Sequence, residues 1–114
     1  MFDFEKLEVY KKARTFNKNM YTLLNNTSFD RRTEDQLRRA SYSIMLNIAE
    51  GSGRFTNPDM RKFYIIARGS AFECLSICDL LRSTGQIEEE LFISFYNQLE
   101  EISKMLFGMI RGLK

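Results

Sequence analysis

The stretch QLRRASYSIMLNIAEGSGR, residues 36–54, decides the fold class. Its apolar and small residues recur every three or four positions, as on one face of an α-helix, and the Gly-Ser-Gly sequence is typical of a helix C-terminus and turn. We expect a helix from Thr33 to about Gly51, opened by a capping box in which Thr33 and Gln36 satisfy terminal N–H groups. The expected core stripe of this helix consists of Leu37, Ala40, Ser41, Ile44 and Ile48.

Three further segments have the same periodicity. The first covers residues 4–24, with Asp3 as its cap. The next covers residues 57–85, with Asn57 as its cap and a glycine at its end. The last begins at the acidic run 88–90, since carboxylates stabilise a helix N-terminus. The expected core residues are Leu7, Tyr10, Ala13, Phe16, Met20 and Leu24 in the first of these segments, and Phe63, Ile66, Ala67, Ser70, Cys74, Ile77 and Leu81 in the second.

Four helices of roughly 20 to 27 residues, joined by short connections, are typical of an antiparallel up-down four-helix bundle. No strand pattern, repeat or linker competes with this interpretation. The 114 residues suit a single all-α domain, residues 1–114, which is large enough to bury its own core.

Composition excludes several classes of function. Histidine is absent, which removes Ser-His-Asp and Cys-His catalysis and imidazole metal sites. Cys74 and Cys78 lie four residues apart on one helix face, so we expect two reduced core residues rather than a disulfide or a zinc site. The first residues lack the basic and apolar regions of a secretion signal, and the sequence has no long apolar run, so we expect a cytoplasmic protein without a membrane span. We also expect no cofactor.

The charge is unevenly distributed along the chain. The net charge is only +2, yet residues 1–68 contain 13 basic and 8 acidic side chains, against 4 and 7 in residues 69–114. This asymmetry is compatible with a polyanion-binding face or with two halves that attract each other in an assembly. The candidate phosphate contacts are Lys11, Lys12, Arg14, Lys18, Arg31, Arg32, Arg38, Arg39 and Arg54.

The same cations have a simpler explanation as helix-surface residues paired with Glu8, Glu34 and Asp35. No aromatic platform of the kind that binds single strands interleaves with them in the sequence. We therefore expect structured RNA or a duplex, recognised through backbone and shape, rather than a single strand.

The third and fourth expected helices are apolar over more of their circumference than the stripe of about 100° that one core needs. Excess apolar surface of this kind marks a partner surface, and we expect self-association. The alternative is irregular packing that buries the extra residues within the monomer. The residues expected at the subunit interface are Ile65, Phe72, Leu75, Phe107 and Ile110.

A hairpin of the second and third helices that turns near residues 54–56 would align charged residues across the pair. Its register would place Arg38 level with Glu73. It would also place Glu50 level with Arg61, and Arg68 level with Ser43. We expect these residues to fix the helix register rather than to catalyse, since no nucleophile, metal-ligating histidine or phosphate loop accompanies them.

Two motifs in this hairpin carry a resemblance to a known family. The runs Asn-Ile-Ala-Glu-Gly (47–51) and Ala-Arg-Gly-Ser-Ala (67–71), with the opening and closing helices, make the chain similar to the bacterial 23S rRNA intervening-sequence proteins. The accessory variability determinant of diversity-generating retroelements looks like a relative of that family. The segment 74–78, Cys-Leu-Ser-Ile-Cys, departs from the more polar family pattern. The motif residues expected to act structurally are Asn47, Glu50, Gly51, Arg68, Gly69, Ser70 and Glu73.

The resemblance implies a homopentameric barrel of four-helix bundles that binds structured nucleic acid and has no catalytic activity. It also implies a neighbouring gene product, such as a reverse transcriptase, as a possible partner. Our leading hypothesis is a non-enzymatic homo-oligomer that binds RNA or DNA through basic residues of the first two helices. The alternative is a protein–protein scaffold without nucleic-acid contact, which the near-neutral total charge favours. A hydrolase is disfavoured by the absence of histidine.

Overall fold

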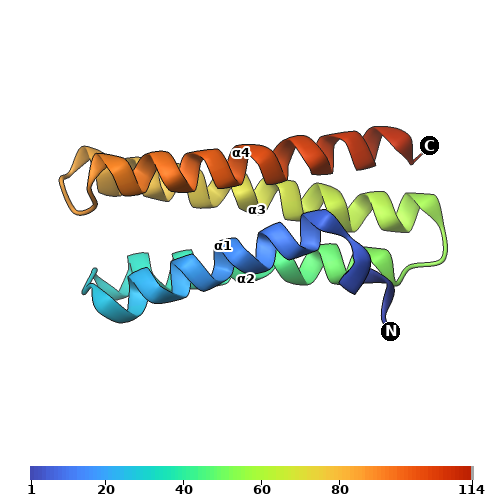
Figure 1. The fold of residues 1–114 in the computed structure, drawn as a ribbon, viewed down its shortest axis with the longest axis horizontal. Coiled ribbons are helices and arrows are strands. Elements are labelled where there is room, and N and C mark those ends of the chain that lie inside the picture. Colours follow the sequence, from blue (N-terminus) through green and yellow to red (C-terminus); the bar gives the residue numbers. More distant parts are fainter. Residues whose placement is uncertain (114) are drawn as a thin grey trace.

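The computed structural model describes residues 1–113 and consists of four long helices after a short 3₁₀ turn. The elements are η1 (Asp3–Lys6), α1 (Glu8–Asn26), α2 (Arg31–Ser52), α3 (Asn57–Ser83) and α4 (Glu89–Gly112). Successive helices run in opposite directions along a rod of 44 × 24 × 22 Å, so both chain ends lie at the same end of the bundle (Figure 1). Within residues 1–113 there is no strand, and the expected antiparallel all-α bundle is confirmed. No helix of this part of the chain is both long and apolar enough to span a membrane.

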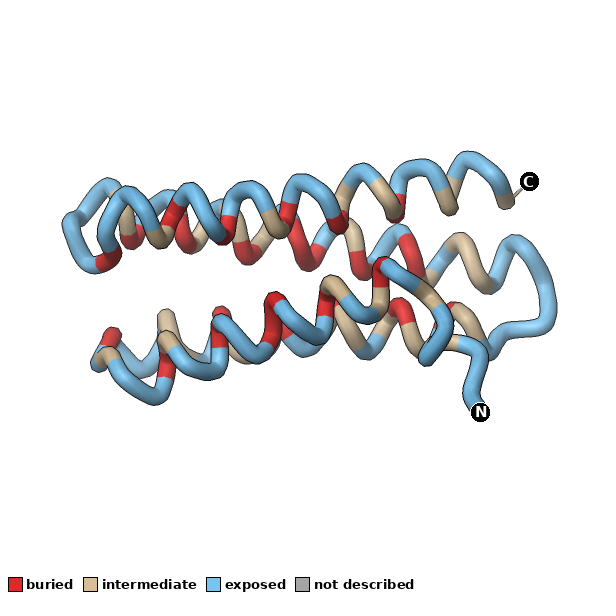
Figure 2. Tube along the Cα trace, in the orientation of Figure 1, coloured by how far each residue is buried: buried red, intermediate tan, exposed pale blue. Residues whose placement is uncertain are grey.

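The buried residues line the inward faces of all four helices (Figure 2). The core stripe of α2 is the one expected, and each of its five members is almost fully buried. The stripes of α1 and α3 are confirmed at most of their positions and are wrong at a few. Val9 is buried while Tyr10 stays at the edge, where its ring packs on Phe4 at a centroid distance of 4.7 Å. Tyr64 is buried in α3, whereas Ile66 is exposed and Phe63 is half-buried.

Three helix N-termini also differ from the expected ones. Asp3 belongs to the 3₁₀ turn, and α1 begins after Leu7 without a side-chain cap. The cap of α2 is Asp30 rather than Thr33, because the carboxylate accepts hydrogen bonds from both the N–H and the hydroxyl of Thr33. These bonds lower the pKa of Asp30. The cap of α3 is Thr56 rather than Asn57, and its hydroxyl accepts from the N–H of Asp59 at 3.3 Å.

The C-terminus of α3 follows the expected pattern. Gly85 has a φ of +72°, and the N–H groups of Gly85 and Gln86 donate to the carbonyls of Arg82 and Leu81. This is a Schellman arrangement, which needs a left-handed residue that glycine adopts without strain. It turns the chain into α4.

The two cysteines are reduced core residues, as expected. Cys74 and Cys78 are both free and fully buried on α3. Burial raises the pKa of the Cys74 thiol to about 11 and that of Cys78 to about 12, because a thiolate loses its hydration in the core. Neither thiol is poised for chemistry at neutral pH.

Candidate nucleic-acid interface

Four of the nine candidate cations are neutralised by carboxylates. Lys11 pairs with Glu8 at 3.3 Å and Arg54 pairs with Glu50 at 2.8 Å, each within one helix. Lys12 of α1 reaches Glu101 of α4 at 2.8 Å, and this hydrogen bond raises the pKa of Lys12. Arg39 of α2 contacts Glu73 of α3 at 2.7 Å. For these four residues the explanation as paired surface residues holds.

The other five candidates lack such partners. Arg14 and Lys18 of α1 and Arg31, Arg32 and Arg38 of α2 have no carboxylate oxygen within 4.0 Å among residues 1–113. Arg31 and Arg32 stand in the first turn of α2, where the helix dipole disfavours a positive charge. These five charges are available to an external anion.

Two exposed tyrosines lie among these cations. A groove of about 390 Å³ between α1 and α2 is lined by Arg14, Lys18, Tyr21 and Tyr42, together with Asn17, Thr22 and Met45. The guanidinium of Arg38 lies over the Tyr21 ring at 5.8 Å. The expectation that no aromatic platform interleaves with the cations is therefore wrong, because packing of two helices joins tyrosines that are 21 positions apart.

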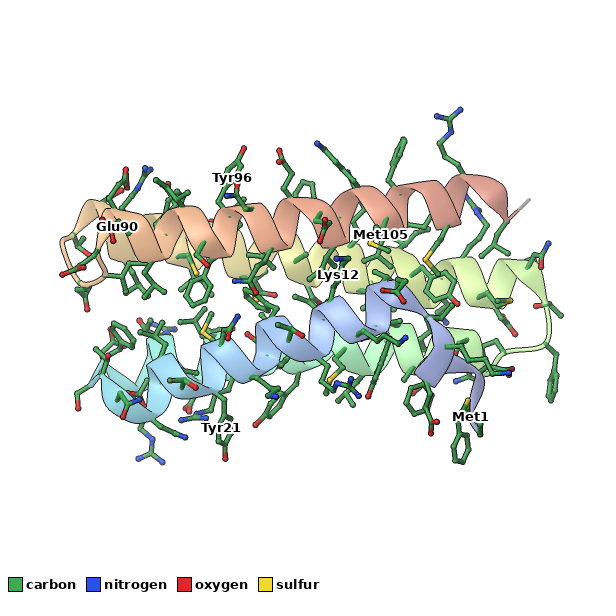
Figure 3. The ribbon with its side chains drawn as sticks, in the orientation of Figure 1. Met1, Lys12, Tyr21, Glu90, Tyr96 and Met105 are labelled. Atoms are coloured by element: carbon green, nitrogen blue, oxygen red, sulfur yellow. The ribbon has the colours of Figure 1, made fainter. Side chains whose placement is uncertain are left out.

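A signal for this groove is present in the sequence in each helix separately. Arg14, Lys18 and Tyr21 lie at i, i+4 and i+7, and so share one face of α1. Arg38, Tyr42 and Met45 follow the same spacing on α2. Only the packing of α1 on α2 brings the two faces together, with Tyr21 projecting away from α4 in Figure 3.

The family-motif residues lie mainly along the contact between α2 and α3. Asn47 donates from Nδ2 to the carbonyl of Ser43 at 2.8 Å and to its hydroxyl at 3.0 Å. The Ser70 hydroxyl of α3 donates to the Ser43 hydroxyl at 2.6 Å. Ser70 and Gly51 are buried. This half-buried polar network specifies how α3 lies on α2.

The expected charge pairing of this hairpin is corrected at each position. Glu73 contacts Arg39 and not Arg38, because one residue turns a helix face by about 100° and Arg38 therefore faces α1. Glu50 binds Arg54 in its own helix, while Nε of Arg61 donates to the carbonyl of Ile110. Ser43 meets Ser70 rather than Arg68.

Gly69 was expected to act structurally in this contact, and the structure gives it no such role. Gly69 is exposed, and a Cβ at this position would have no neighbour within 4 Å. The neighbouring small residues Ser70 and Ala71 are buried.

A second and larger groove runs between α3 and α4. It has a volume of about 830 Å³ and is lined by Phe72, Leu75 and Phe107 of the expected interface, with Arg68 among the other residues. The guanidinium of Arg68 lies over the rings of Phe72 and Phe107, at 4.7 and 5.4 Å, and its Nε has no hydrogen-bond partner among the described residues.

The remaining interface candidates lie outside this groove. Ile65 is exposed on α3, whereas Ile110 is half-buried and packs on the core of its own bundle. Leu75 is also half-buried against that core. Irregular packing therefore absorbs part of the apolar surplus, while Phe72, Phe107 and Ile65 remain exposed.

The described residues contain no group of three or more Asp, Glu or Cys side chains arranged to hold a metal ion. The acidic runs at the start and middle of α4 are exposed, and three of their members serve as ion-pair partners of Lys12, Arg82 and Lys104.

Comparison with known proteins agrees with the motif resemblance. Residues 5–108 match the model of the family described as 23S rRNA-intervening sequence protein. A crystal structure of a protein of unknown function from the S23 ribosomal protein family of Bacteroides thetaiotaomicron VPI-5482 has a similar fold, with a TM-score of 0.83. The two chains are 29% identical, and the match covers 90% of this chain and 97% of the other. A comparison with curated proteins gives no match. With a family match over nearly the whole chain and the expected motifs in the α2–α3 contact, the chain belongs to the 23S rRNA-intervening sequence protein family.

Proposed function

We propose that this chain is a non-enzymatic cytoplasmic protein that binds structured RNA through the α1/α2 side of the bundle. The observation that carries the proposal is the set of five cations without carboxylate partners, Arg14, Lys18, Arg31, Arg32 and Arg38. Each of them can neutralise a phosphate without first breaking an ion pair of the protein. The family description, which names an element of 23S rRNA, supports RNA as the ligand.

The proposal includes self-association through the groove between α3 and α4. Phe72 and Phe107 each leave about half of their surface exposed there and both contact the guanidinium of Arg68, and neighbouring exposed rings of this kind mark a partner surface. The α1/α2 cations lie on other helices and so remain accessible in such an assembly. A ring of five copies, as the family resemblance implies, would multiply weak phosphate contacts by avidity.

The experiment compares unpaired with paired cations. Binding of a labelled structured RNA is measured at 50 and 200 mM salt for wild type, for Arg31→Gln/Arg32→Gln, and for the control Lys11→Gln/Arg54→Gln. We expect binding to weaken steeply with salt, because each neutralised phosphate adds about 0.7 to 0.9 to the slope of log K against log salt. Loss of Arg31 and Arg32 should reduce that slope by up to about 2, and the control should change it little. Equal effects of the two variants would refute the assignment of the interface.

A protein–protein scaffold is the second candidate, and the α3/α4 groove favours it. The groove combines exposed aromatic rings with Arg68, whose charge has no carboxylate within 4.0 Å among residues 1–113. Such a groove suits a partner helix, for example from a neighbouring gene product such as a reverse transcriptase. Absence of RNA binding at 50 mM salt, together with a monomeric mass by light scattering, would favour the scaffold, because the α3/α4 groove would then be free to take a partner.

A further inference from the structure

The groove between α1 and α2 combines two features of single-strand binding sites. Tyr21 and Tyr42 supply aromatic faces and are 52% and 43% exposed. Arg14 and Lys18 supply charge beside them, and the guanidinium of Arg38 lies over the Tyr21 ring at 5.8 Å. Bases stack on such rings while the phosphates that connect them contact neighbouring cations.

The positive charge of the groove favours a negatively charged ligand. No carboxylate is among its lining residues, and its cations have no ion-pair partner in the described part of the chain. A neutral apolar helix would leave these charges uncompensated on binding, which costs free energy. A flexible polyanion with flat apolar faces compensates the charge and covers the rings at the same time.

A third observation comes from Asn17 at the contact between the helices. Asn17 is 9% exposed and lines the groove. Its Nδ2 donates to the carbonyls of Ala13 and Ser41, which determines the orientation of the amide. Its Oδ1 is consequently left buried without a donor among the described residues. The described part of the bundle therefore leaves this acceptor, in a residue that lines the groove, without a hydrogen bond.

We infer that the α1/α2 groove binds unpaired nucleotides of an RNA strand, with bases stacked on Tyr21 and Tyr42 and phosphates on Arg14, Lys18 and Arg38. The inference rests on the proposed function and names its ligand more narrowly, as a loop or bulge within the structured RNA. It also differs from the sequence expectation of recognition by backbone and shape alone.

The test separates stacking from charge. Fluorescence anisotropy is measured with a labelled 12-nucleotide oligouridine and with a 12-base-pair RNA duplex. The variants are Tyr21→Leu/Tyr42→Leu, the conservative Tyr21→Phe/Tyr42→Phe, and the control Phe55→Leu. Phe55 is a fully exposed aromatic residue between α2 and α3, and it lines neither groove.

We expect the leucine pair to weaken oligouridine binding at least tenfold and to leave duplex binding within twofold of wild type. The phenylalanine pair and Phe55→Leu should retain oligouridine binding within about threefold, because the first keeps the stacking faces and the second lies outside the groove. All variants keep the net charge, so the salt slope should not change. Circular dichroism and light scattering verify that fold and particle mass are unaltered.

The outcomes distinguish this inference from the proposed function. If the leucine pair binds oligouridine as tightly as wild type, or weakens both probes equally, the groove is not a single-strand site. In that case the proposal that the protein binds RNA through Arg31 and Arg32 is unaffected. If wild type binds neither probe at 50 mM salt, the proposed function itself is wrong and the inference fails with it.

Discussion

Gly51 of α2 lies directly against the ring of Tyr64 of α3. A methyl group on Gly51 would approach Cε1 of Tyr64 to 2.8 Å and Cβ of Phe63 to 3.1 Å. Tyr64 is 2% exposed, so its ring can yield only by disturbing the core. The glycine of the Asn-Ile-Ala-Glu-Gly motif therefore sets how closely the two helices pack, and its role is structural.

Replacement of this glycine should destabilise the protein. We predict that Gly51→Ala lowers the free energy of unfolding by about 1 to 3 kcal/mol, the usual cost of overpacking a core. The control is Gly69→Ala, whose methyl group would enter open space within α3 and should stabilise by up to about 1 kcal/mol. Urea denaturation, monitored by circular dichroism, measures the free energy of unfolding of both variants. Similar values for the two variants would contradict the close contact.

The ion pair between Arg39 and Glu73 should contribute little to stability. Its side chains are 62% and 38% exposed, so solvent screens the attraction. We predict a coupling of about 0.2 to 1 kcal/mol in a double-mutant cycle of Arg39→Ala and Glu73→Ala. The matched cycle of Arg38→Ala and Glu73→Ala should give none, since Arg38 faces Tyr21. A coupling between Arg38 and Glu73 instead would support the helix register that was expected from the sequence.

The buried cysteines predict a loss of stability at alkaline pH. Their pKa values are about 11 and 12 in the folded chain, against an ordinary value of 9.0. Above pH 9 the unfolded chain therefore releases thiol protons that the folded chain retains, and the free energy of unfolding falls as the pH rises. Burial raises the pKa of Tyr64 as well, which acts in the same direction.

Urea midpoints at pH 8, 9.5 and 10.5 measure this effect. The variant Cys74→Ala/Cys78→Ala lacks both thiols, so its stability should decline less steeply over this range, even though its absolute stability is lower. In the folded wild type at pH 8, a thiol reagent should react with neither cysteine until denaturant is added. If the urea midpoints of the two proteins fell in parallel as the pH rises, the thiols would have the same pKa values in the folded and the unfolded chain.

The α3/α4 groove should determine particle size if the proposed self-association is correct. Phe107, which is 47% exposed, lines this groove, whereas Ile93, which is 50% exposed, is an α4 residue outside it. We predict that Phe107→Glu yields smaller particles that remain helical, because burial of the new charge in a subunit contact is costly. The control Ile93→Glu should keep the wild-type mass. Light scattering measures the particle mass and circular dichroism the helix content of both variants. An unchanged mass for Phe107→Glu would show that this residue is not part of the interface.

The features that the sequence predicted correctly are those that depend on one helix at a time. The core stripe of α2, from Leu37 to Ile48, follows from the helical period alone. The left-handed Gly85 at the end of α3 and the buried pair Cys74 and Cys78 follow from local chemistry. Four such helices with short connections bury their apolar faces by packing as antiparallel neighbours, so the fold class was determined as well.

The features that only the tertiary structure decided depend on how one helix is rotated against another. A shift of one residue turns a side chain by about 100°, and this separates Arg39, which meets Glu73, from Arg38, which meets Tyr21. The same geometry decided which cations are neutralised, since Lys12 finds its carboxylate on α4 at Glu101. The local period of each helix carries no information about rotation or register between helices, because these are set by packing across the core.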